Sequence, residues 1–514
     1  MSYPYNLGIS FYSVAAEQGG RTALRYPSGE KIDYRGLNER SNRMGRYLLS
    51  KGFVKGDVIA LFNEKSEIAY SLMLGCLKTG VIYTNLDVSS PSQRLIKILG
   101  NCQPKAIFFD KQDEVLWGTC REALPDSVLI DLHDEGLRAD AASLEGGDLE
   151  ESLQVNGGDA AYIMFTSGST GFPKGAVMSH NNLLNFIQWG RTTFAVTPED
   201  VFTNANPIYF DNSVFDFYTS LFNGATLVPL SHDLVKNAQK VVQAINDSGC
   251  TIWFSVPSLL VYLLTTKSLT AADFKTIRRI SFGGEGFPKN KLKQLYDLFG
   301  ERITLFNVYG PTECTCICSS YIISAEDFDN MNELAPLGHM APNFGYTILP
   351  FDESNPDFGE LALMGPCVGL GYYNDPARTG QSFVQNPQSR FQQLMYKTGD
   401  VVQRATNGYL HFRGRVDNQI KHMGYRIELE EVEAAFASLH YINEVGVVYE
   451  KINAELGQIK AFVSVASGDV RKEGISADLK AILPPYMLPR VITILEILPK
   501  NANGKIDRKA LSTL

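Results

Sequence analysis

The stretch FTSGSTGFPKG, residues 165–175, decides how this chain is interpreted. It follows a short apolar run, residues 160–165, that is typical of a buried β-strand. Its glycines allow close backbone approach to a ligand, its hydroxyls donate hydrogen bonds, and Lys174 adds a positive charge. Such a loop can fold around a phosphate chain. It is not a Walker loop, because Gly175 stands where that motif has Ser or Thr after the lysine. Taken alone, the loop is equally typical of a flexible surface turn.

Helical and strand-like segments alternate on both sides of this loop. Apolar residues at helical spacing predict helices at 34–51, at 67–79, from about 181 onward and at 235–248. Short apolar runs predict strands at 57–62, 105–109, 160–165, 226–229 and 251–255. This alternation favours parallel sheets covered on both faces, so the sequence predicts an α/β fold with two tandem α/β subdomains. The acidic, glycine-containing stretch 141–158 is predicted to be a surface loop.

The pattern changes after about residue 336. Short, Gly-bounded segments at 359–364 and 408–413 are rich in β-formers and predict a small β-barrel-like subdomain. A charged amphipathic run at 428–440 predicts a helix within a compact α+β domain. We place a hinge at Asp417. It divides the chain into a large N-terminal domain, 1–416, and a small mobile C-terminal domain, 417–514.

Composition excludes several classes of protein. The chain has 514 residues, 44% hydrophobic and 20% charged, as in ordinary globular proteins. Its 47 basic and 56 acidic residues give a net charge of −9, which argues against a nucleic-acid partner. No run of eighteen apolar residues and no secretory signal pattern is present, so neither a membrane partner nor export is expected.

The cysteines are sparse, eight in all, and three of them stand at spacing two: Cys314, Cys316 and Cys318. Metal binding favours a C-x-x-C pair and a second cluster, and the sequence has neither. We therefore predict a strand that carries three buried thiols, in a protein of the reducing cytoplasm.

Three further segments hold residues suited to a nucleotide. In NVYGPTE, residues 307–313, Tyr309 can stack on a base, Thr312 can donate to a phosphate, and Glu313 can hold Mg²⁺. In YKTGD, residues 396–400, Asp400 suits a ribose diol. In NANGKIDRKAL, residues 501–511, Lys505 can neutralise a developing phosphate charge. Each has a plain alternative: a turn, a surface acid, a solvated tail lysine.

Taken together and in this order, the segments resemble the adenylate-forming (ANL) superfamily, and within it the amino-acid adenylation domains of nonribosomal peptide synthesis. The resemblance covers nearly the whole chain. It rests on LKTGVIYTNLDVSSPSQRL (77–95), FTSGSTGFPKG, FDNSV (210–214), NVYGPTE, GELALMGPCVGLGYYNDPART (359–379), YKTGD, GRVDNQIKHMGYRIELEEVE (414–433) and NGKIDRKAL (503–511).

The resemblance implies a two-step ligase that uses ATP and Mg²⁺. A carboxylate attacks the α-phosphate of ATP to give an acyl-adenylate and pyrophosphate, and a thiol then displaces AMP. Lys505, Thr312 and Glu313 are the implied catalytic residues, with Glu313 as the Mg²⁺ ligand. The implied nucleotide-binding residues are Thr166, Ser167, Gly168, Ser169, Thr170, Lys174, Gly284, Glu285, Asn307, Tyr309, Gly310, Asp400 and Arg415. Asp417 is the implied hinge, and Gly424 marks the implied pantetheine channel.

Asp211 indicates the class of acid. In the resembled adenylation domains this position pairs with the substrate ammonium, and a buried aspartate without a cation is costly. The alternative is a helix cap for the segment that begins at Val214. The implied substrate-binding set is Asp211, Asn212, Phe215, Ser258, Ser281, Gly283, Val308, Cys316 and Ile317. D-alanyl carrier-protein ligases usually have cysteine where Gly283 stands, which weakens a D-alanine assignment.

The implied function is activation of an amino acid and its transfer to the phosphopantetheine thiol of a separate carrier protein. No carrier segment follows residue 514 in this sequence, so the carrier is expected in trans. An acyl-CoA or aryl-CoA synthetase and an aryl-acid adenylating enzyme are the nearest alternatives. A non-catalytic adenylate sensor and a metal or redox protein built on the cysteine run are more distant ones. His180, His339 and His422 are expected to be structural, since a carboxylate nucleophile needs no base.

Overall fold

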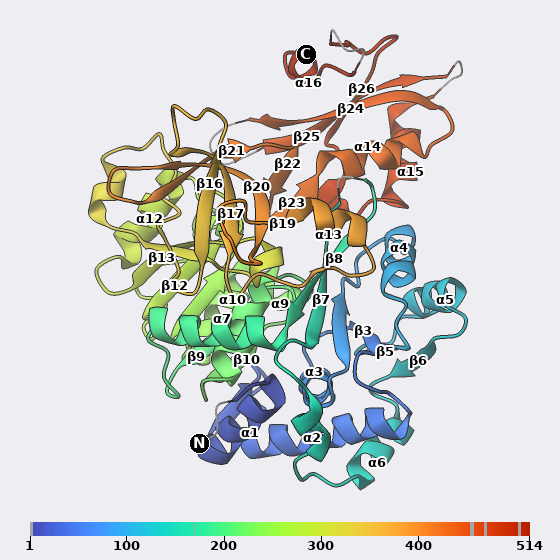
Figure 1. Cartoon of the computed structure of the whole chain (residues 1–514), viewed down its shortest axis with the longest axis vertical. Coiled ribbons are helices and arrows are strands. Elements are labelled where there is room, and N and C mark those ends of the chain that lie inside the picture. Colours follow the sequence, from blue (N-terminus) through green and yellow to red (C-terminus); the bar gives the residue numbers. More distant parts are fainter. Residues whose placement is uncertain (1–3, 169, 453–456, 467–469, 502–504) are drawn as a thin grey trace.

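The computed structural model describes residues 4–168, 170–452, 457–466, 470–501 and 505–514. Its first large sheet has the strand order β18-β8-β7-β4-β3-β5-β6 (Figure 1). These strands are β3 (Val58–Phe62), β4 (Ile82–Leu86), β5 (Ala106–Phe109), β6 (Val128–Asp131), β7 (Ala160–Thr166), β8 (Lys174–Ser179) and β18 (Gly371–Tyr372). The central strands β3, β4, β5 and β7 run parallel, as the βαβ pattern of the sequence predicts.

The second large sheet has the order β15-β14-β13-β12-β11-β9-β10-β1-β2. Its strands are β1 (Thr22–Arg25), β2 (Lys31–Asp33), β9 (Val201–Asn204), β10 (Thr226–Pro229), β11 (Ile252–Ser255), β12 (Arg279–Gly283), β13 (Thr304–Tyr309), β14 (Ser319–Ile322) and β15 (His339–Met340). Strands β9 to β13 are mutually parallel, so their carboxyl ends open at one edge of the sheet.

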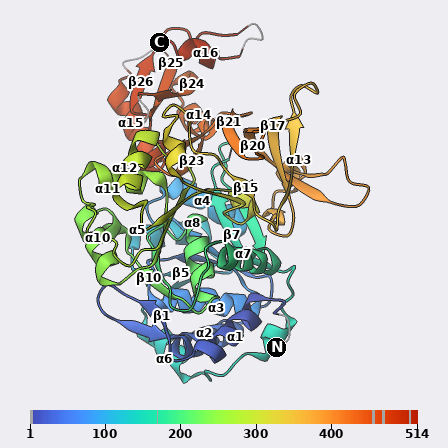
Figure 2. The ribbon, with the colours of Figure 1, turned by 90° about the vertical axis from the view of Figure 1, so that its left-hand side faces the viewer.

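Helices cover both sheets and fill the space between them (Figures 1 and 2). Side chains of α1 (Leu7–Gln18), α2 (Tyr34–Ser50), α3 (Glu67–Thr79) and α7 (His180–Thr193) join one apolar core with both sheets. The outer face of the first sheet packs on α4 (Ser92–Cys102) and α5 (Glu114–Ala123), and α6 (Glu135–Ser143) packs against α2. The outer face of the second sheet packs on α10 (Ala238–Asp247), α11 (Pro257–Thr265) and α12 (Lys289–Phe299).

The two α/β subdomains exchange segments along the chain. Strand β1 belongs to the second sheet, where Leu24 pairs with Leu227 of β10. Strands β7 and β8 belong to the first sheet, where Tyr162 pairs with Tyr83. The predicted α/β fold class is therefore confirmed, but the subdomains are interleaved rather than strictly successive.

A smaller antiparallel sheet follows, with the order β16-β17-β20-β19 and β21 paired to β20. Its elements are β16 (Gly345–Pro350), β17 (Phe358–Met364), α13 (Pro376–Ser382), β19 (Phe383–Gln385), β20 (Leu394–Arg404) and β21 (Leu410–Arg415). It corresponds to the predicted β-rich subdomain. Strand β21 ends at Arg415 and the next strand begins at Gln419, so Asp417 lies in the short connection to the C-terminal domain. That Asp417 acts as a hinge remains a prediction.

The C-terminal domain combines a hairpin with a sheet covered by helices. Its elements are β22 (Gln419–His422), β23 (Tyr425–Glu428), α14 (Leu429–Ala437), β24 (Ile442–Lys451), β25 (Gly457–Val465), α15 (Lys472–Lys480), β26 (Val491–Ile494) and α16 (Arg508–Leu511). Helices α14 and α15 pack their apolar sides on the β24-β25-β26 sheet. This gives the predicted α+β arrangement.

Two local predictions need correction. The helix predicted at 235–248 is present as α10 but begins at Ala238, after the separate short helix α9 (His232–Val235), because the Asn237 side chain caps α10 by accepting from the Lys240 N–H at 3.0 Å. The stretch 141–158 is not only a surface loop. It contains a short 3₁₀ helix, Glu150–Gln154, and it buries Leu149 and Val155, the carbonyl of Val155 accepting from the Asn6 side chain at 2.8 Å.

The strand predicted for the three alternating cysteines is wrong, although the thiols are buried. Thr312–Cys314 form a 3₁₀ turn, and Thr315 and Cys316 have φ of +67° and +103°, so β14 begins only at Ser319. The Cys318 N–H donates to the Tyr309 carbonyl at 2.8 Å, which ties the turn to the end of β13. Over the described ranges, no group of three or more His, Cys, Asp and Glu side chains is arranged to hold a metal.

Within the same described ranges, no helix is both long enough and apolar enough to cross a membrane.

Candidate active site

A cavity of about 200 Å³ lies where the carboxyl ends of the two sheets meet the C-terminal domain. This edge is the usual ligand site of α/β proteins. Its walls come from segments far apart in the chain, among them residues 85–87, 164–167, 209–212, 308–312 and 423–426. The C-terminal hairpin, together with Tyr486 of the same domain, thus forms one wall of a cavity otherwise built by the N-terminal domain.

The hairpin owes its shape to a two-residue turn. Met423 and Gly424 have φ of +53° and +82°, as a type I′ turn requires, and Gly424 suits this geometry because it lacks a Cβ. A Cβ at Gly424 would also lie 2.9 Å from the Val256 side chain. The Gly424 N–H donates to Glu285 at 2.8 Å, and the second oxygen of Glu285 accepts from the Ser258 N–H at 2.8 Å. The tip of the hairpin is therefore fixed against the N-terminal domain.

Strand register places four polar side chains on one face of this hairpin. Gln419 pairs with Glu428, and Lys421 pairs with Arg426. Since alternate residues of a strand point to the same side, all four share a face. Gln419, Lys421 and Arg426 line the cavity.

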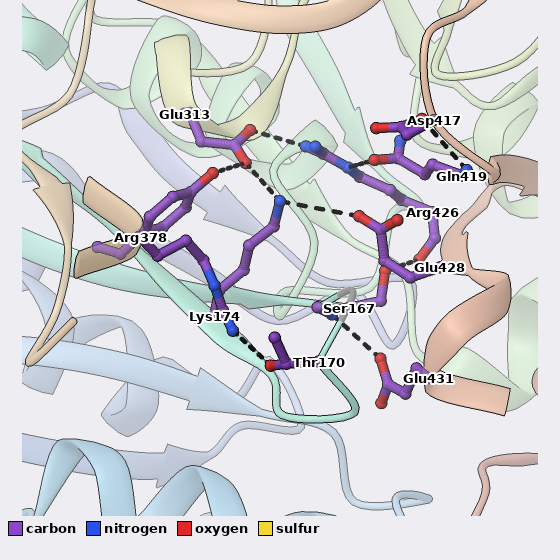
Figure 3. A network of polar contacts seen from close by, with 12 residues as sticks. Ser167, Thr170, Lys174, Glu313, Arg378, Asp417, Gln419, Arg426, Glu428 and Glu431 are labelled. Carbon is purple, nitrogen blue, oxygen red and sulfur yellow. Dashed lines mark hydrogen bonds and ion pairs between the residues drawn. The ribbon is translucent and has the colours of Figure 1, made fainter. Parts of the chain in front are cut away.

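Glu313 lies at the centre of a buried charge cluster (Figure 3). Arg426 approaches one carboxylate oxygen at 2.7 Å, while Lys174 lies 3.3 Å from the other. The Tyr372 hydroxyl donates to the same carboxylate at 2.8 Å. Lys174 also lies 3.9 Å from Glu428. Two cations, one from each domain, thus compensate one fully buried acid.

Electrostatics in this cluster favour the charged forms of Glu313 and Arg426. Burial alone would raise the pKa of Glu313, but Arg426 and Lys174 hold it well below its usual range. The pKa of Arg426 is raised well above normal, because the carboxylate of Glu313 outweighs the cost of burial. Burial and the neighbouring Arg426 lower the pKa of Lys174. The cluster holds its charges as a unit, so removing one member leaves others uncompensated.

Asp211 faces the cavity and does not cap a helix. It occupies the first position before α8 (Asn212–Val214), but its side chain makes no capping hydrogen bond. Its carboxylate instead accepts from the Thr312 hydroxyl at 2.6 Å. Burial raises the pKa of Asp211, an effect that the Thr312 hydrogen bond opposes. Among the described residues, no Lys, Arg or His forms an ion pair with it.

Asp400 forms a second acidic corner of the cavity. Its carboxylate accepts from the Tyr309 hydroxyl at 2.6 Å and pairs with Arg415 at 2.5 Å. The same guanidinium binds Asp417 through two contacts, of 2.6 and 2.7 Å. Lys421 lies over the Tyr309 ring, 5.6 Å from its centroid. Tyr309, Asp400 and Arg415 are thus brought together as predicted, with Lys421 added from the hairpin.

The phosphate-type loop is described except for Ser169, which lies outside the described residues. The Thr166 hydroxyl is buried without a hydrogen-bond partner. The Ser167 hydroxyl donates to the Arg426 carbonyl at 2.7 Å, and Arg378 donates to the Thr170 hydroxyl at 2.6 Å. Lys174 is already the first residue of β8. Thr166 therefore remains able to donate to a ligand.

Most predicted site residues line the cavity. Those that do are Thr166, Ser167, Asp211, Asn212, Gly283, Gly284, Val308, Tyr309, Gly310, Thr312, Cys316, Ile317, Asp400, Arg415 and Gly424. Of the remaining described members, Phe215 and Ser281 are buried behind the wall, and Asn307 donates to the Pro336 carbonyl at 2.7 Å. Ser258 and Glu285 hold the hairpin, as described above.

Lys505 is not brought to the cavity. Its side chain is exposed, and its backbone N–H donates to the Asn501 side chain at 3.1 Å. It stands three residues before α16, and α16 lies at the outer end of the C-terminal domain (Figure 1). In this arrangement the domain presents Lys421 and Arg426 to the cavity instead.

Sequence reasoning missed these two residues and three others. Lys421, Arg426, Glu428 and Glu431 all fall inside the motif quoted for residues 414–433, and Arg94 inside that for 77–95. The available signal was period-two alternation around His422-Met423-Gly424-Tyr425, which predicts a tight hairpin with Lys421 and Arg426 on one face.

In this arrangement the Glu313 carboxylate is bound by Arg426, Lys174 and Tyr372, so it could receive a magnesium ion only after Arg426 leaves with the C-terminal hairpin. A single carboxylate then suits Mg²⁺, which is commonly bound through one or two carboxylates with the remaining ligands from phosphate and water.

The chain belongs to the AMP-binding enzyme family. The family model described as "AMP-binding enzyme" matches residues 11–373, and the one described as "AMP-binding enzyme C-terminal domain" matches residues 431–505. The adenylate-forming assignment made from the sequence motifs, and with it the prediction of an enzyme, is confirmed.

Two relatives that match over most of their length have names more specific than that of the family. A D-alanine–D-alanyl carrier protein ligase of Listeria monocytogenes is 31% identical over 502 residues, covering 95% of this chain and 94% of its own. An L-proline–[L-prolyl-carrier protein] ligase of Pseudomonas fluorescens is 32% identical over 489 residues, covering 94% of each chain. Both are named as ligases of an amino acid and a carrier protein.

Solved structures agree on the fold. An artificially fused adenylation–PCP di-domain NRPS, NpsA-ThdA from Klebsiella oxytoca, superposes with a TM-score of 0.82 at 21% identity, covering 96% of this chain and 94% of that one. An o-succinylbenzoate CoA synthetase from Bacillus subtilis gives a TM-score of 0.84 at 21% identity, covering 98% of each. At these identities the likeness establishes the architecture of two domains, large and small.

Proposed function

We propose that the protein activates an amino acid with ATP as an aminoacyl-AMP and transfers the aminoacyl group to the phosphopantetheine thiol of a separate carrier protein. The observation that carries this proposal is the position of Asp211. Its carboxylate faces the cavity, accepts a hydrogen bond from the Thr312 hydroxyl and forms no ion pair with a described residue. Placing such a charge away from water is unfavourable unless a cation meets it. A substrate ammonium group is the matching cation.

The first half-reaction joins the substrate carboxylate to the α-phosphorus of ATP. A carboxylate oxygen forms the new P–O bond, and the bond to pyrophosphate breaks. The loop 166–174 would bind the phosphates through its N–H groups and hydroxyls, Thr312 would donate to the α-phosphate, and Asp400 with Tyr309 would hold the nucleoside. Mg²⁺, held by Glu313, would neutralise charge on the phosphates. Lys505 would add a cation when the C-terminal domain takes another orientation.

The second half-reaction transfers the acyl group to sulfur. The thiolate attacks the acyl carbon, a C–S bond forms, and AMP leaves. Gly424 lies in the cavity wall, donates its N–H to Glu285 and packs so closely on Val256 that a side chain would not fit there. We place the pantetheine arm beside Gly424, as the family resemblance implies. The names of the relatives support a carrier protein as the acceptor.

Two further points complete the proposal. The acceptor in this proposal is a carrier protein supplied in trans, in line with the relatives' names, which describe ligases of an amino acid and a carrier protein. The eight cysteines are free and buried, which suits the reducing cytoplasm.

The test is a pyrophosphate-exchange screen over L-, D-, β- and aromatic amino acids, each offered beside its deaminated acid. We expect exchange with at least one amino acid and strong rejection of the matching acid without the amino group. Equal turnover of both members of a pair would contradict the proposal and favour an acyl-CoA or aryl-acid enzyme.

The substitution Asp211→Asn directly tests whether Asp211 pairs with the substrate ammonium group. Truncating one member of a buried ion pair costs about 2 to 5 kcal/mol, so kcat/KM for the amino acid should fall at least roughly tens-fold. The affinity for ATP should barely change, because the nucleotide contacts lie on other segments. Steady-state exchange kinetics measure both. Asp113→Asn, at an exposed helix cap of α5, removes the same charge away from the cavity and serves as the control.

A further inference from the structure

The carboxylate of Glu431 sits in the phosphate-type loop. Glu431 is on α14 of the C-terminal domain, and one of its oxygens accepts from the Gly168 N–H at 3.2 Å (Figure 3). Its other oxygen is bound by the guanidinium of Arg94, on α4 of the N-terminal domain. The two side chains are only 6% and 8% exposed. This is a buried anion site with an acidic side chain as its occupant.

The same donors suit a phosphate. A backbone N–H in a glycine-rich loop and a guanidinium are the groups that proteins use to bind phosphate oxygens, and a carboxylate presents a similar pair of acceptors. Arg94 also lines the cavity. On the next turn of α4, Lys97 donates to the Gly171 carbonyl at 3.0 Å and holds the loop beside this helix.

The donors and the occupant belong to different domains. Arg94, Lys97 and Gly168 are all in the N-terminal domain, so they stay together if the C-terminal domain moves. Glu431 would leave with α14. Helix α14 also covers the loop closely, since a Cβ at Gly171 would lie 2.6 Å from that of Ala434. A phosphate group and the docked helix therefore compete for the same place.

We propose that Arg94 and the Gly168 N–H form an anion subsite for the terminal phosphates of the nucleotide and for the pyrophosphate product, and that Glu431 is its built-in competitor. This deepens the proposed function and rests on it. While pyrophosphate occupies the subsite, Glu431 is excluded and the hairpin cannot dock. Once pyrophosphate leaves, Glu431 takes its place, and thioester formation can begin. Arg94 is thereby a phosphate-binding residue, and the order of the two half-reactions is set by the exchange of one anion for another.

The first measurement is calorimetric binding of pyrophosphate in the presence of Mg²⁺, with no amino acid present. Glu431→Gln keeps the shape and removes the competing charge, so pyrophosphate should bind about tenfold tighter than to wild type, within the usual range of coupling between two sites. Glu430→Gln is the matched control. Glu430 is the adjacent residue, and its contacts, Asn418 and Arg508, both lie in the C-terminal domain.

The second measurement isolates Arg94. In the Glu431→Gln background the docked contact is already weakened, so adding Arg94→Ala should lower pyrophosphate affinity about tenfold, as expected for a lost charge-assisted hydrogen bond. Arg94→Lys in the same background should retain part of the affinity. Melting curves of each variant show that it is folded.

Three outcomes would overturn the inference. They are wild-type affinity in Glu431→Gln, equal tightening in Glu430→Gln, and no effect of Arg94→Ala in the Glu431→Gln background. The last outcome would mean that the Arg94–Glu431 ion pair only holds the docked domains together and that Arg94 binds no phosphate. Because the assay contains no amino acid and no carrier, these results are independent of the pyrophosphate-exchange screen that tests the proposed function.

Discussion

The two ends of the C-terminal domain differ sharply in what surrounds them. At one end, the hairpin β22–β23 places Lys421, Gly424 and Arg426 in the cavity wall. At the other end, Lys505 is exposed close to α16, whose Arg508 forms an ion pair with Glu433 of the same domain. Both ends carry a lysine within a motif of the family, yet only one of them faces the cavity.

If the C-terminal domain moves as one body, it can offer the cavity only one of its ends at a time. The hairpin end is bound through Glu285, Glu313 and the loop at Gly168. Bringing Lys505 to the same cavity requires these contacts to open and the domain to turn about the connection at 416–418. Such a hinge movement is the common way for a two-domain enzyme to exchange one set of residues for another.

The largest expected effect comes from the exposed end. Lys505→Ala should reduce adenylation, measured by pyrophosphate exchange, by roughly 10²- to 10³-fold, because one preorganised charge is lost from the transition state. Transfer from a preformed aminoacyl-adenylate should be nearly unchanged. Lys509→Ala, which removes an exposed lysine on α16, is the control. Equal loss in both half-reactions would remove the distinction between the two ends.

Arg426→Gln should give the opposite pattern at the hairpin end. It leaves the buried carboxylate of Glu313 with Lys174 as its remaining ion-pair partner, so the docked arrangement should weaken by about tenfold or more. Single-turnover transfer to the carrier thiol should slow accordingly, and pyrophosphate exchange should not.

Arg413→Gln serves as the control for Arg426→Gln, since Arg413 pairs with Glu333 on the N-terminal domain, away from the hairpin. If Arg426→Gln slows pyrophosphate exchange instead, Arg426 acts in the first half-reaction and the assignment is wrong.

The smallest effect is expected at the hairpin turn. Gly424→Ala introduces a side chain where φ is +82° and where a Cβ would crowd Val256, so docking should lose about 1 kcal/mol, or roughly fivefold in transfer rate. Gly408→Ala has the same backbone strain, with φ of +84°, in a turn of the β-rich subdomain. A comparison of the two variants by transfer kinetics separates strain from loss of docking.

Much of the fold followed from local pattern. The alternation of apolar strands and amphipathic helices is a short-range property, and β10 and α3 occupy the predicted residues. Which sheet a strand joins depends instead on partners far away, so the pairing of Leu24 with Leu227 had no local signal. The 3₁₀ turn at Thr312–Cys314 was missed because alternation of small apolar residues looks like a strand when the positive φ values of Thr315 and Cys316 are unknown.

The site was predictable where each residue stands in a clear motif. Tyr309, Asp400 and Arg415 come together because Asp400, in the middle of β20, pairs with Arg415 at the end of β21 and accepts from Tyr309 at the end of β13. The cluster around Glu313 was not predictable from the sequence, because Lys174 and Arg426 are 252 positions apart and meet only through docking of the domains. Lys505 shows the converse limit: its motif is clear, but a sequence does not say which orientation of a domain is occupied.

The interleaving of the two large sheets has a consequence for synthesis of the chain. Strand β1 emerges early from the ribosome but pairs with β10, about two hundred residues later, so the shared core cannot close until both sheets exist. Contacts of such long sequence separation slow folding and leave apolar surface exposed meanwhile. A fragment ending near residue 158 would lack β7, β8 and β10 and should aggregate rather than fold. We therefore expect the large domain to fold as a single cooperative unit, in which β1 stays without its sheet partner until β10 has been synthesised.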